Sequence, residues 1–227
     1  FMRTDYNLGM SGFYFNRYYT EWTEDRLGGR ISVGRLINEY WSGSLALRLE
    51  DVDIRNIPAG APSDLTSVAG SNFLSTVGAT LSNDTRDNAF IPTQGHFLEG
   101  SFEQAFGEFN YSRLEANGSQ YFTVRERADG FGKHIVQLYG SVAWSGNDTP
   151  IFERYYAGGY SSFRGFAFRG VSPVQGGMKV GGNFMALGTV EYMLPVTASD
   201  QIRMVGFTDF GTVQQNVGFE DFRVSAG

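Results

Sequence analysis

Two acidic residues, Glu191 and Asp209, are the side chains best placed to share one cation. They lie at equal distances along the chain from Asp200, on two alternating segments joined by a short turn, so an in-register hairpin would set them side by side. Neighbouring carboxylates repel one another, and a guanidinium between them relieves this repulsion while donating bidentate hydrogen bonds. The chemistry that these two acids offer is therefore an electrostatic clamp on an arginine.

The long connection at residues 146–182 carries the candidate cation, Arg164. Arginine keeps its charge inside a protein because its pKa exceeds about 12, so an Arg164 folded back into an enclosed interior needs acceptors around it. Glu191 and Asp209 are the acceptors that we expect. The competing interpretation leaves Arg164 as a solvated loop arginine and the two acids as the lining of a wet pore.

Three further acids, Glu99, Glu103 and Glu115, could suggest a catalytic carboxylate pair. Adjacent strands routinely place acids together on one face, so we expect no catalysis from them. The sequence also has no G-x-S-x-G elbow, no P-loop and no G-x-G-x-x-G after a predicted strand. The chain is therefore not expected to be an enzyme.

Neither histidine, His96 or His134, has an acid or a second histidine at ligand spacing. Both lie near the start of a predicted strand, where an ordinary structural role is expected. The absence of cysteine excludes a disulfide framework, a thiolate metal site and a cysteine nucleophile. We expect no metal and no cofactor.

Composition narrows the class of protein. The 227 residues carry a formal charge of -6, which argues against nucleic acid as a partner, because nucleic-acid binders usually present a basic face. No run approaches the roughly 18 apolar residues of a membrane helix. The 15% aromatic content and the 30 glycines are instead typical of a membrane β-barrel, with its aromatic girdles and tight turns.

Period-two alternation is the main structural signal. In the segment from Ile135 to Trp144, Val136, Leu138 and Val142 share one face, and Gln137 lies on the other. The same one-sided alternation occurs in three more segments: 41–50, 96–104 and 112–120. Weaker strands are expected at 7–18, 30–36, 72–83, 184–192, 203–211 and 222–227, which gives about ten in all.

A soluble β-sandwich also alternates, but its apolar face meets a second sheet. Here nearly every segment mixes Leu, Val and Phe with small residues on the same face, as lipid-facing strands do. We therefore expect an all-β fold, a transmembrane antiparallel β-barrel, and keep the sandwich as the alternative.

Connection lengths and aromatic residues mark the ends of the predicted strands. Connections 37–40 and 195–201 are short, whereas 51–71 and 146–182 are long, and such alternation is typical of the two ends of an outer-membrane barrel. Aromatic residues near the strand ends predict interface belts, with ordinary strand-end packing as the alternative. These aromatic residues are Tyr14, Phe15, Tyr18, Tyr19 and Trp22 at one end, and Tyr40 and Trp41 at another.

The long connection contains FERYYAGGYSSFRGF at residues 152–166. Its AGG turn, followed at that distance by the RGF tripeptide, resembles the sixth extracellular loop of the BamA-like outer-membrane assembly factors, of the POTRA/surface-antigen superfamily. Three more segments resemble the same family: GRLINEY at 34–40, GGNFMA at 181–186 and FTDFGTV at 207–213. The match covers essentially the whole chain.

The resemblance implies that the segments are strands five to fourteen of a sixteen-strand barrel. Residues 1–227 would then be one partial transmembrane β-barrel domain, truncated at both ends, without POTRA domains, whose extracellular loop 146–182 carries the RGF motif.

The resemblance also implies a loop-anchor site. Arg164 would be the anchor, with Glu191 and Asp209 as its partners on the barrel wall. The rest of the motif is Gly165 and Phe166 together with Gly158 and Gly159, and its glycines would permit the turns and close backbone approach that such a loop needs.

The family's function would make this an integral protein of the bacterial outer membrane that catalyses the folding and insertion of β-barrel proteins. Its partners would be nascent outer-membrane β-barrel proteins, accessory lipoproteins of an assembly complex and the lipid bilayer, with no nucleic acid. The alternative is a protein-translocating pore of the two-partner-secretion or translocation and assembly type, which would share the RGF loop.

Overall fold

A computed structural model describes residues 6–197, 200 and 202–227, and most of these residues belong to one antiparallel sheet. The prediction of an all-β fold with about ten strands is confirmed, since the sheet has ten, in the order β1-β2-β3-β4-β5-β6-β7-β10-β11-β12. They are β1 (Tyr6–Tyr18), β2 (Thr23–Leu36), β3 (Trp41–Arg55), β4 (Gly70–Asp84), β5 (Gly95–Phe106), β6 (Ser112–Arg125), β7 (His134–Ser145), β10 (Phe184–Pro195), β11 (Arg203–Gln214) and β12 (Arg223–Ala226).

Three small elements lie between β7 and β10. A 3-10 turn, η1, covers Ile151–Glu153, and β8 (Val174–Gln175) pairs with β9 (Met178–Lys179) in a separate two-stranded hairpin.

The helix α1 (Ser63–Thr66) is a single turn between β3 and β4. No helix among the described residues is both long and apolar enough to cross a membrane.

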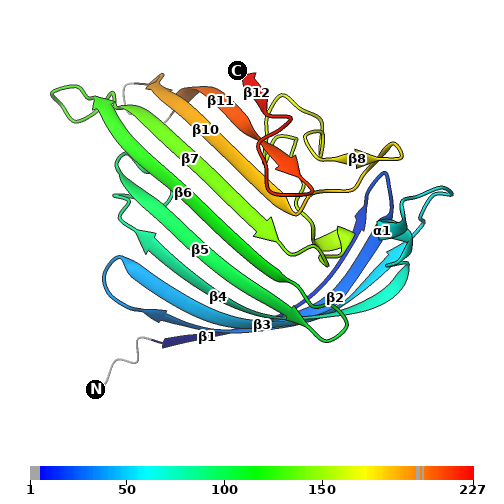
Figure 1. Cartoon of the computed structure of the whole chain (residues 1–227). Helices are drawn as coiled ribbons and strands as arrows, with labels where there is room; N and C mark the ends of the chain where they lie inside the picture. Colours follow the sequence, from blue (N-terminus) through cyan, green and yellow to red (C-terminus); the bar gives the residue numbers. More distant parts are fainter. Residues whose placement is uncertain (1–5, 198–199, 201) are drawn as a thin grey trace.

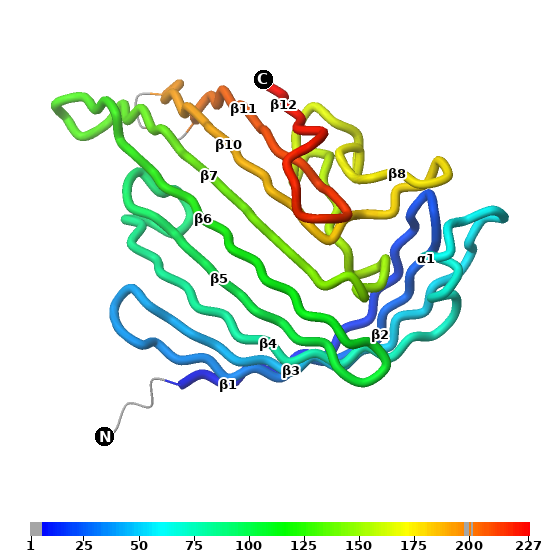
Figure 2. Tube along the Cα trace, viewed as in Figure 1, coloured from blue at the N-terminus to red at the C-terminus, as the bar shows by residue number. Residues whose placement is uncertain are grey.

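The sheet is curved, and the connection between β7 and β10 lies on its concave side near one end of the strands (Figures 1 and 2). We call this connection, residues 146–183, the inner loop. Its contacts reach Arg26 on β2 and Asp209 on β11, two strands that are far apart in the order of the sheet. The inner loop therefore bridges two separate parts of one wall.

The outer, convex face of the sheet is apolar and open. Leu8 and Met10 on β1 are 76% and 79% exposed, and Leu45 on β3 is 62% exposed. Among the described residues, the only other sheet is the β8–β9 hairpin, so no second sheet covers these side chains. This excludes the sandwich and confirms the barrel type of wall, whose outer face is suited to lipid.

The buried core lies inside the curve, at the end of the strands that carries the inner loop, and not along the whole sheet. Wall residues and loop residues pack together there, which places the inner loop by apolar burial. This cluster comprises Trp22, Val52, Ile54, Leu65, Val68, Leu74, Ala105 and Tyr111 with Ile151, Phe152 and Val180 of the inner loop.

The aromatic belt predicted at residues 14–22 is partly wrong. Tyr14 and Tyr18 are 68% and 81% exposed, as a belt requires, but Trp22 is only 1% exposed. The cause is a tight turn, in which the Tyr19 N–H donates to the Trp22 carbonyl at 2.9 Å and folds both rings over the inner loop, where they contact Tyr156 and Phe168.

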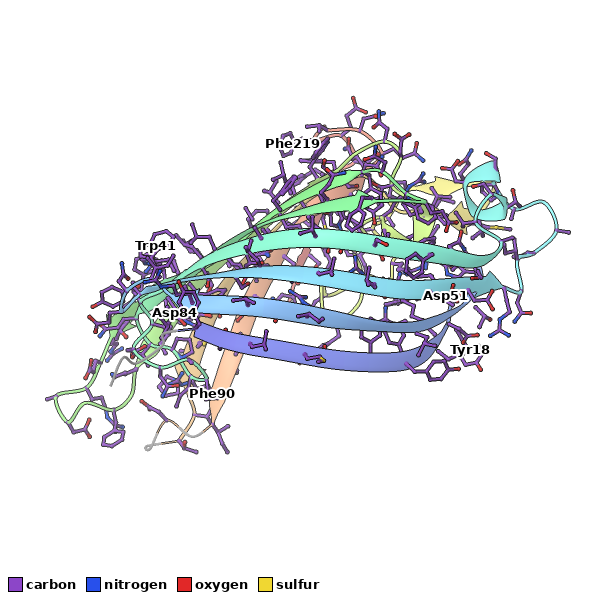
Figure 3. All side chains as sticks on the ribbon, turned by 90° about the horizontal axis from the view of Figure 1, so that it is seen from below. Tyr18, Trp41, Asp51, Asp84, Phe90 and Phe219 are labelled. Atoms are coloured by element: carbon purple, nitrogen blue, oxygen red, sulfur yellow. The ribbon has the colours of Figure 1, made fainter. Side chains whose placement is uncertain are left out.

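The prediction of connection lengths is confirmed for three of the four connections it named, because 37–40 is short at one end of the strands and 56–69 and 146–183 are long at the other, but the remaining connections do not follow the same alternation. Figure 3 shows the two ends, with Tyr18 and Asp51 at the end of the inner loop and Trp41, Asp84 and Phe90 at the other. At the loop end, connections 19–22 and 107–111 are short, whereas 85–94 and 126–133 at the opposite end are longer. An aspartate within each of these longer turns stabilises it. The carboxylate of Asp87 accepts hydrogen bonds from three backbone N–H groups of its turn, and that of Asp129 accepts one.

Strands β2 and β3 extend further than the alternation indicated. β2 begins at Thr23 rather than at residue 30, and β3 ends at Arg55, so the connection predicted at 51–71 covers only 56–69. The additional residues include buried charges such as Glu24 and Arg26. An alternation rule cannot recognise such a segment as strand, because the inner loop covers polar side chains there.

The register of the β10–β11 hairpin differs from the prediction by two residues. Glu191 is opposite Phe207, and Asp209 is opposite Thr189, so the two acids are not directly paired. They still share one face, as diagonal neighbours, because a shift of two residues preserves the face on which a side chain lies. Of the turn predicted at 195–201, residues 198, 199 and 201 lie outside the described residues.

Candidate functional site

The candidate site is the contact between Arg164 of the inner loop and two acids of the wall. The Arg164 guanidinium donates from Nε to Asp209 Oδ2 at 2.8 Å and from Nη2 to Asp209 Oδ1 at 2.6 Å. It also donates from Nη1 to Glu191 Oε1 at 2.6 Å. The structure therefore brings the three predicted residues together, with one guanidinium between two carboxylates.

Further contacts fix the orientation of the clamp. The backbone N–H of Arg164 donates to Asp209 Oδ2 at 2.9 Å, and the Thr189 hydroxyl donates to Asp209 Oδ1 at 2.9 Å. The guanidinium carbon lies 3.6 Å from the centre of the Phe207 ring, a cation–π contact. The Ser225 hydroxyl of β12 donates to the Arg164 carbonyl. Backbone and side chain of Arg164 are thus held by three strands of the wall.

The clamp is permanently charged. The hydrogen bonds from Arg164 to Asp209 raise the pKa of the guanidinium above its ordinary value, against the opposing effect of burial, and the bond to Glu191 adds to this. Asp209 is only 3% exposed. A desolvated carboxylate of this kind is stable only when a cation and hydrogen-bond donors surround it.

Two glycines of the motif have conformations that exclude larger residues. Gly158 has φ 119°, and a Cβ there would lie 2.4 Å from the Ala167 carbonyl oxygen and 2.4 Å from the Gly170 nitrogen. Gly165, next to Arg164, has φ 83°, and its Cβ would lie 2.9 Å from Ser225 Cβ. Both backbone segments therefore approach a neighbour more closely than a side chain permits.

The remaining motif residues shape the tip of the inner loop. The Gly159 N–H donates to the Phe166 carbonyl at 3.0 Å and closes the turn. Phe166 packs edge to face on Phe163, with ring centres 5.0 Å apart. Phe163 is 1% exposed and belongs to a second apolar cluster with Val213 of the wall. The tip is therefore anchored by apolar packing beside the clamp.

Four of the five other candidates from the sequence have structural partners. His96 Nε2 lies 2.6 Å from Asn83 Oδ1, and His134 Nδ1 lies 2.9 Å from the Tyr192 hydroxyl. Glu103 and Glu115 each pair with an arginine. In the part of the chain that the structure describes, no group of three or more His, Asp or Glu residues could hold a metal ion.

The inner loop has a second charged contact, which the sequence pattern does not predict. Glu153, in η1, binds three arginines of the wall at once, namely Arg26, Arg48 and Arg113. Each arginine lies on the polar face of its strand. The polar face is the feature of the sequence from which an inward orientation of these arginines could be predicted. Alternation predicts that such arginines point inward, but it does not identify the acid they meet.

The chain is similar in sequence to known outer-membrane proteins. A family model described as the Omp85 superfamily domain matches residues 1–227. The outer membrane protein assembly factor BamA of Nitratidesulfovibrio vulgaris is 24% identical over 216 residues, which cover 91% of this chain and 27% of that protein. The BamA of Neorickettsia risticii is 26% identical over 195 residues, covering 83% of this chain and 26% of that protein.

A SAM50-like protein of Schizosaccharomyces pombe is 22% identical over 199 residues, which cover 83% of this chain and 42% of that protein. The chain thus spans less than half the length of each of these curated relatives. The crystal structure of BamA from Haemophilus ducreyi lacking POTRA domains 1-3 superposes with a TM-score of 0.81 at 19% identity, covering 100% of this chain and 53% of that one.

Replacing Arg164 by Ala is expected to destabilise the folded wall and the seated loop together. It leaves Asp209 and Glu191 as neighbouring carboxylates without the guanidinium that binds both, at a cost of about 2–4 kcal/mol. The measurement is the temperature at which the heat-modifiable, folded band is lost on a gel. Arg164→Lys should recover little, because an ammonium lacks the planar fork that reaches both acids. Wild-type heat resistance in Arg164→Ala would contradict the clamp.

Replacing Gly158 by Ala is expected to expose the inner loop to protease. The new Cβ meets two backbone atoms at 2.4 Å in addition to the strain of its positive φ. The matched control is Gly176→Ala in the same loop, where φ is also positive, at 58°, but a Cβ meets nothing within 4 Å. Trypsin cleavage within residues 146–183 should be faster in Gly158→Ala than in Gly176→Ala. Equal rates would show that close approach at Gly158 is unimportant.

Proposed function

This chain belongs to the Omp85 superfamily, and we propose that it is the barrel wall of an assembly factor that folds and inserts β-barrel proteins into the outer membrane. Its strands lie in the outer membrane, with the apolar convex face of the sheet against lipid. The two BamA relatives that carry this activity in their names are longer proteins, and we infer the same activity for the protein to which this chain belongs.

One observation carries the proposal, namely the inner loop held on the concave side of a lipid-facing sheet by Arg164, Glu191 and Asp209. The RGF tripeptide and the AGG turn before it are the features that resembled assembly factors in the sequence. The geometry supports that resemblance, because the motif arginine reaches the wall, and the motif glycines occupy positions that exclude side chains.

The mechanism that we propose has no chemical step. A strand edge of the barrel would template an incoming strand through backbone hydrogen bonds. A wall whose apolar height does not match the bilayer would thin the surrounding lipid and lower the barrier to insertion. In this scheme the inner loop keeps the wall in a shape that can accept a new strand, and Arg164 is the residue that keeps the loop in place.

The partners in this proposal follow from the same scheme. Nascent β-barrel proteins are the substrates, because their unpaired strands have the backbone donors and acceptors that an edge can satisfy. Accessory lipoproteins of an assembly complex are further partners, and the lipid bilayer is the medium in which insertion takes place.

The test is reconstitution of the protein, expressed from its complete reading frame, into lipid vesicles with an unfolded β-barrel substrate. Vesicles that contain it are expected to convert the substrate to its heat-modifiable, protease-protected form faster than empty vesicles do. Arg164→Ala should lose most of this acceleration. The exposed Arg125→Ala, which removes the same charge from the end of β6, should retain it.

A protein-translocating pore would give a different result. It would pass a soluble substrate into the vesicle lumen and raise ion conductance when the inner loop is deleted, with no faster folding of the β-barrel substrate. That outcome would replace the proposal of an assembly factor.

A further inference from the structure

The inner loop has a second charged contact with the wall, 11 residues before Arg164 and of opposite sign. Glu153 Oε1 lies 2.6 Å from Arg26 Nη1, and Glu153 Oε2 lies 3.2 Å from Arg48 Nη2 and 2.9 Å from Arg113 Nη1. These arginines belong to β2, β3 and β6. One carboxylate therefore joins three strands, with β4 and β5 lying between β3 and β6 in the sheet.

Apolar burial sets the position of Glu153. Ile151 and Phe152, the other residues of η1, are 1% and 7% exposed and belong to the core shared with the wall. The Arg26 Nη2 donates to the Phe152 carbonyl at 3.0 Å, so the wall also holds the backbone of the turn. Glu153 is thus aimed at the arginines by the turn that carries it.

The carboxyl group of Glu153 is ionised at neutral pH. Burial alone would raise its pKa, but the charges of Arg48, Arg26 and Arg113 outweigh burial and lower the pKa to about 2. The side chain is only 4% exposed. A buried carboxylate that stays charged needs such partners, and here it has three.

The wall arginines do not need Glu153 for their own charge balance. Each has at least one acid of the wall beside it, at 2.7 to 3.0 Å. The pairs are Arg26 with Glu24 and Glu50, Arg48 with Glu50 and Glu103, and Arg113 with Glu115. Removing the charge of Glu153 therefore leaves a paired wall and weakens only the bonds that this carboxylate makes to the wall.

The Arg164 clamp differs in this respect. Its acids, Asp209 and Glu191, both bind the same guanidinium, and the other side-chain donor to Asp209 is the neutral Thr189. Loss of Arg164 thus disturbs the wall as well as the loop. The two contacts have different consequences, although both hold the same segment.

We propose that Glu153 is a positioning residue, a second anchor that seats the inner loop and so presents Arg164 to its acids, without being required for the folded wall. The contribution of Glu153 to assembly rests on the proposed function. Its contribution to the position of the inner loop can be tested without any assembly assay.

The experiment measures how accessible the segment between the two anchors is. The sequence contains no cysteine, so Ala157→Cys provides a single thiol at a position that is 2% exposed in the seated loop. Tyr160→Cys, at a position that is 93% exposed, provides the rate for an open site. The protein from the complete reading frame is labelled in membranes with an impermeant maleimide.

In the Ala157→Cys background, Glu153→Gln is expected to raise the labelling rate roughly tenfold, because charge-assisted bonds to three arginines are replaced by weaker ones. Glu153→Asp should give an intermediate rate, since it keeps the charge but shortens the reach. The matched control is Asp148→Asn, which removes one exposed charge from the same loop and should leave the rate unchanged.

Heat resistance separates the anchor from a general structural role. Glu153→Gln should keep the folded, heat-modifiable band that Arg164→Ala loses. An unchanged labelling rate in Glu153→Gln would overturn the proposal, and so would loss of its folded band. Should the cysteine background itself fail to fold, trypsin cleavage within residues 146–183 of the cysteine-free variants gives the same comparison.

Failure of the proposed function would look different. In that case Glu153→Gln would still expose the inner loop, but neither it nor the parent protein would accelerate the folding of a β-barrel substrate. With the function intact, Glu153→Gln is expected to slow that folding while the wall stays heat-resistant.

Discussion

Pairing of charges between the inner loop and the wall is the constraint on which this structure depends. Arg164 cannot lose its proton, so a loop that carries it to the concave side of the sheet must find anionic acceptors there. Asp209 and Glu191 supply them from neighbouring strands. Ion pairs of this kind add modest net stability, because desolvation offsets much of the attraction, but breaking one side leaves the other uncompensated. Their main effect is to select one position of the loop.

Apolar packing and ion pairing make different contributions to seating the loop. Burial of Ile151, Phe152 and Val180 draws the loop to the wall, but it is non-directional and tolerates sliding. The fork of Arg164 and the carboxylate of Glu153 are directional, and each meets its partners in only one arrangement. The two faces of the sheet differ in the same way. The apolar outer face contacts lipid without directional bonds, whereas the polar inner face fixes the position of the inner loop through directional bonds.

The sequence predicted the sheet well and the interior less well, for physical reasons. Alternation follows from the pleat, so the strands and their outward faces were readable from one chain. Register depends on a turn that local pattern does not define, and Glu191 and Asp209 proved to be diagonal neighbours rather than a direct pair. The belt prediction fails at Trp22 because a position near a strand end does not determine whether a side chain is exposed. The contacts of Glu153 cannot be predicted from local pattern, because its partners lie on three strands that only the curvature of the sheet brings together.

Opposite signs at the two anchors restrict the loop further than either anchor alone. A loop displaced so that Glu153 approached Asp209 and Glu191 would bring like charges together, which is strongly unfavourable in a desolvated interior. The anchors also lie on different parts of the sheet, β2, β3 and β6 for one, β10 and β11 for the other. Any movement that separates these parts must release one anchor first. Release of Glu153 leaves the wall arginines paired with wall acids, whereas release of Arg164 leaves Asp209 and Glu191 uncompensated.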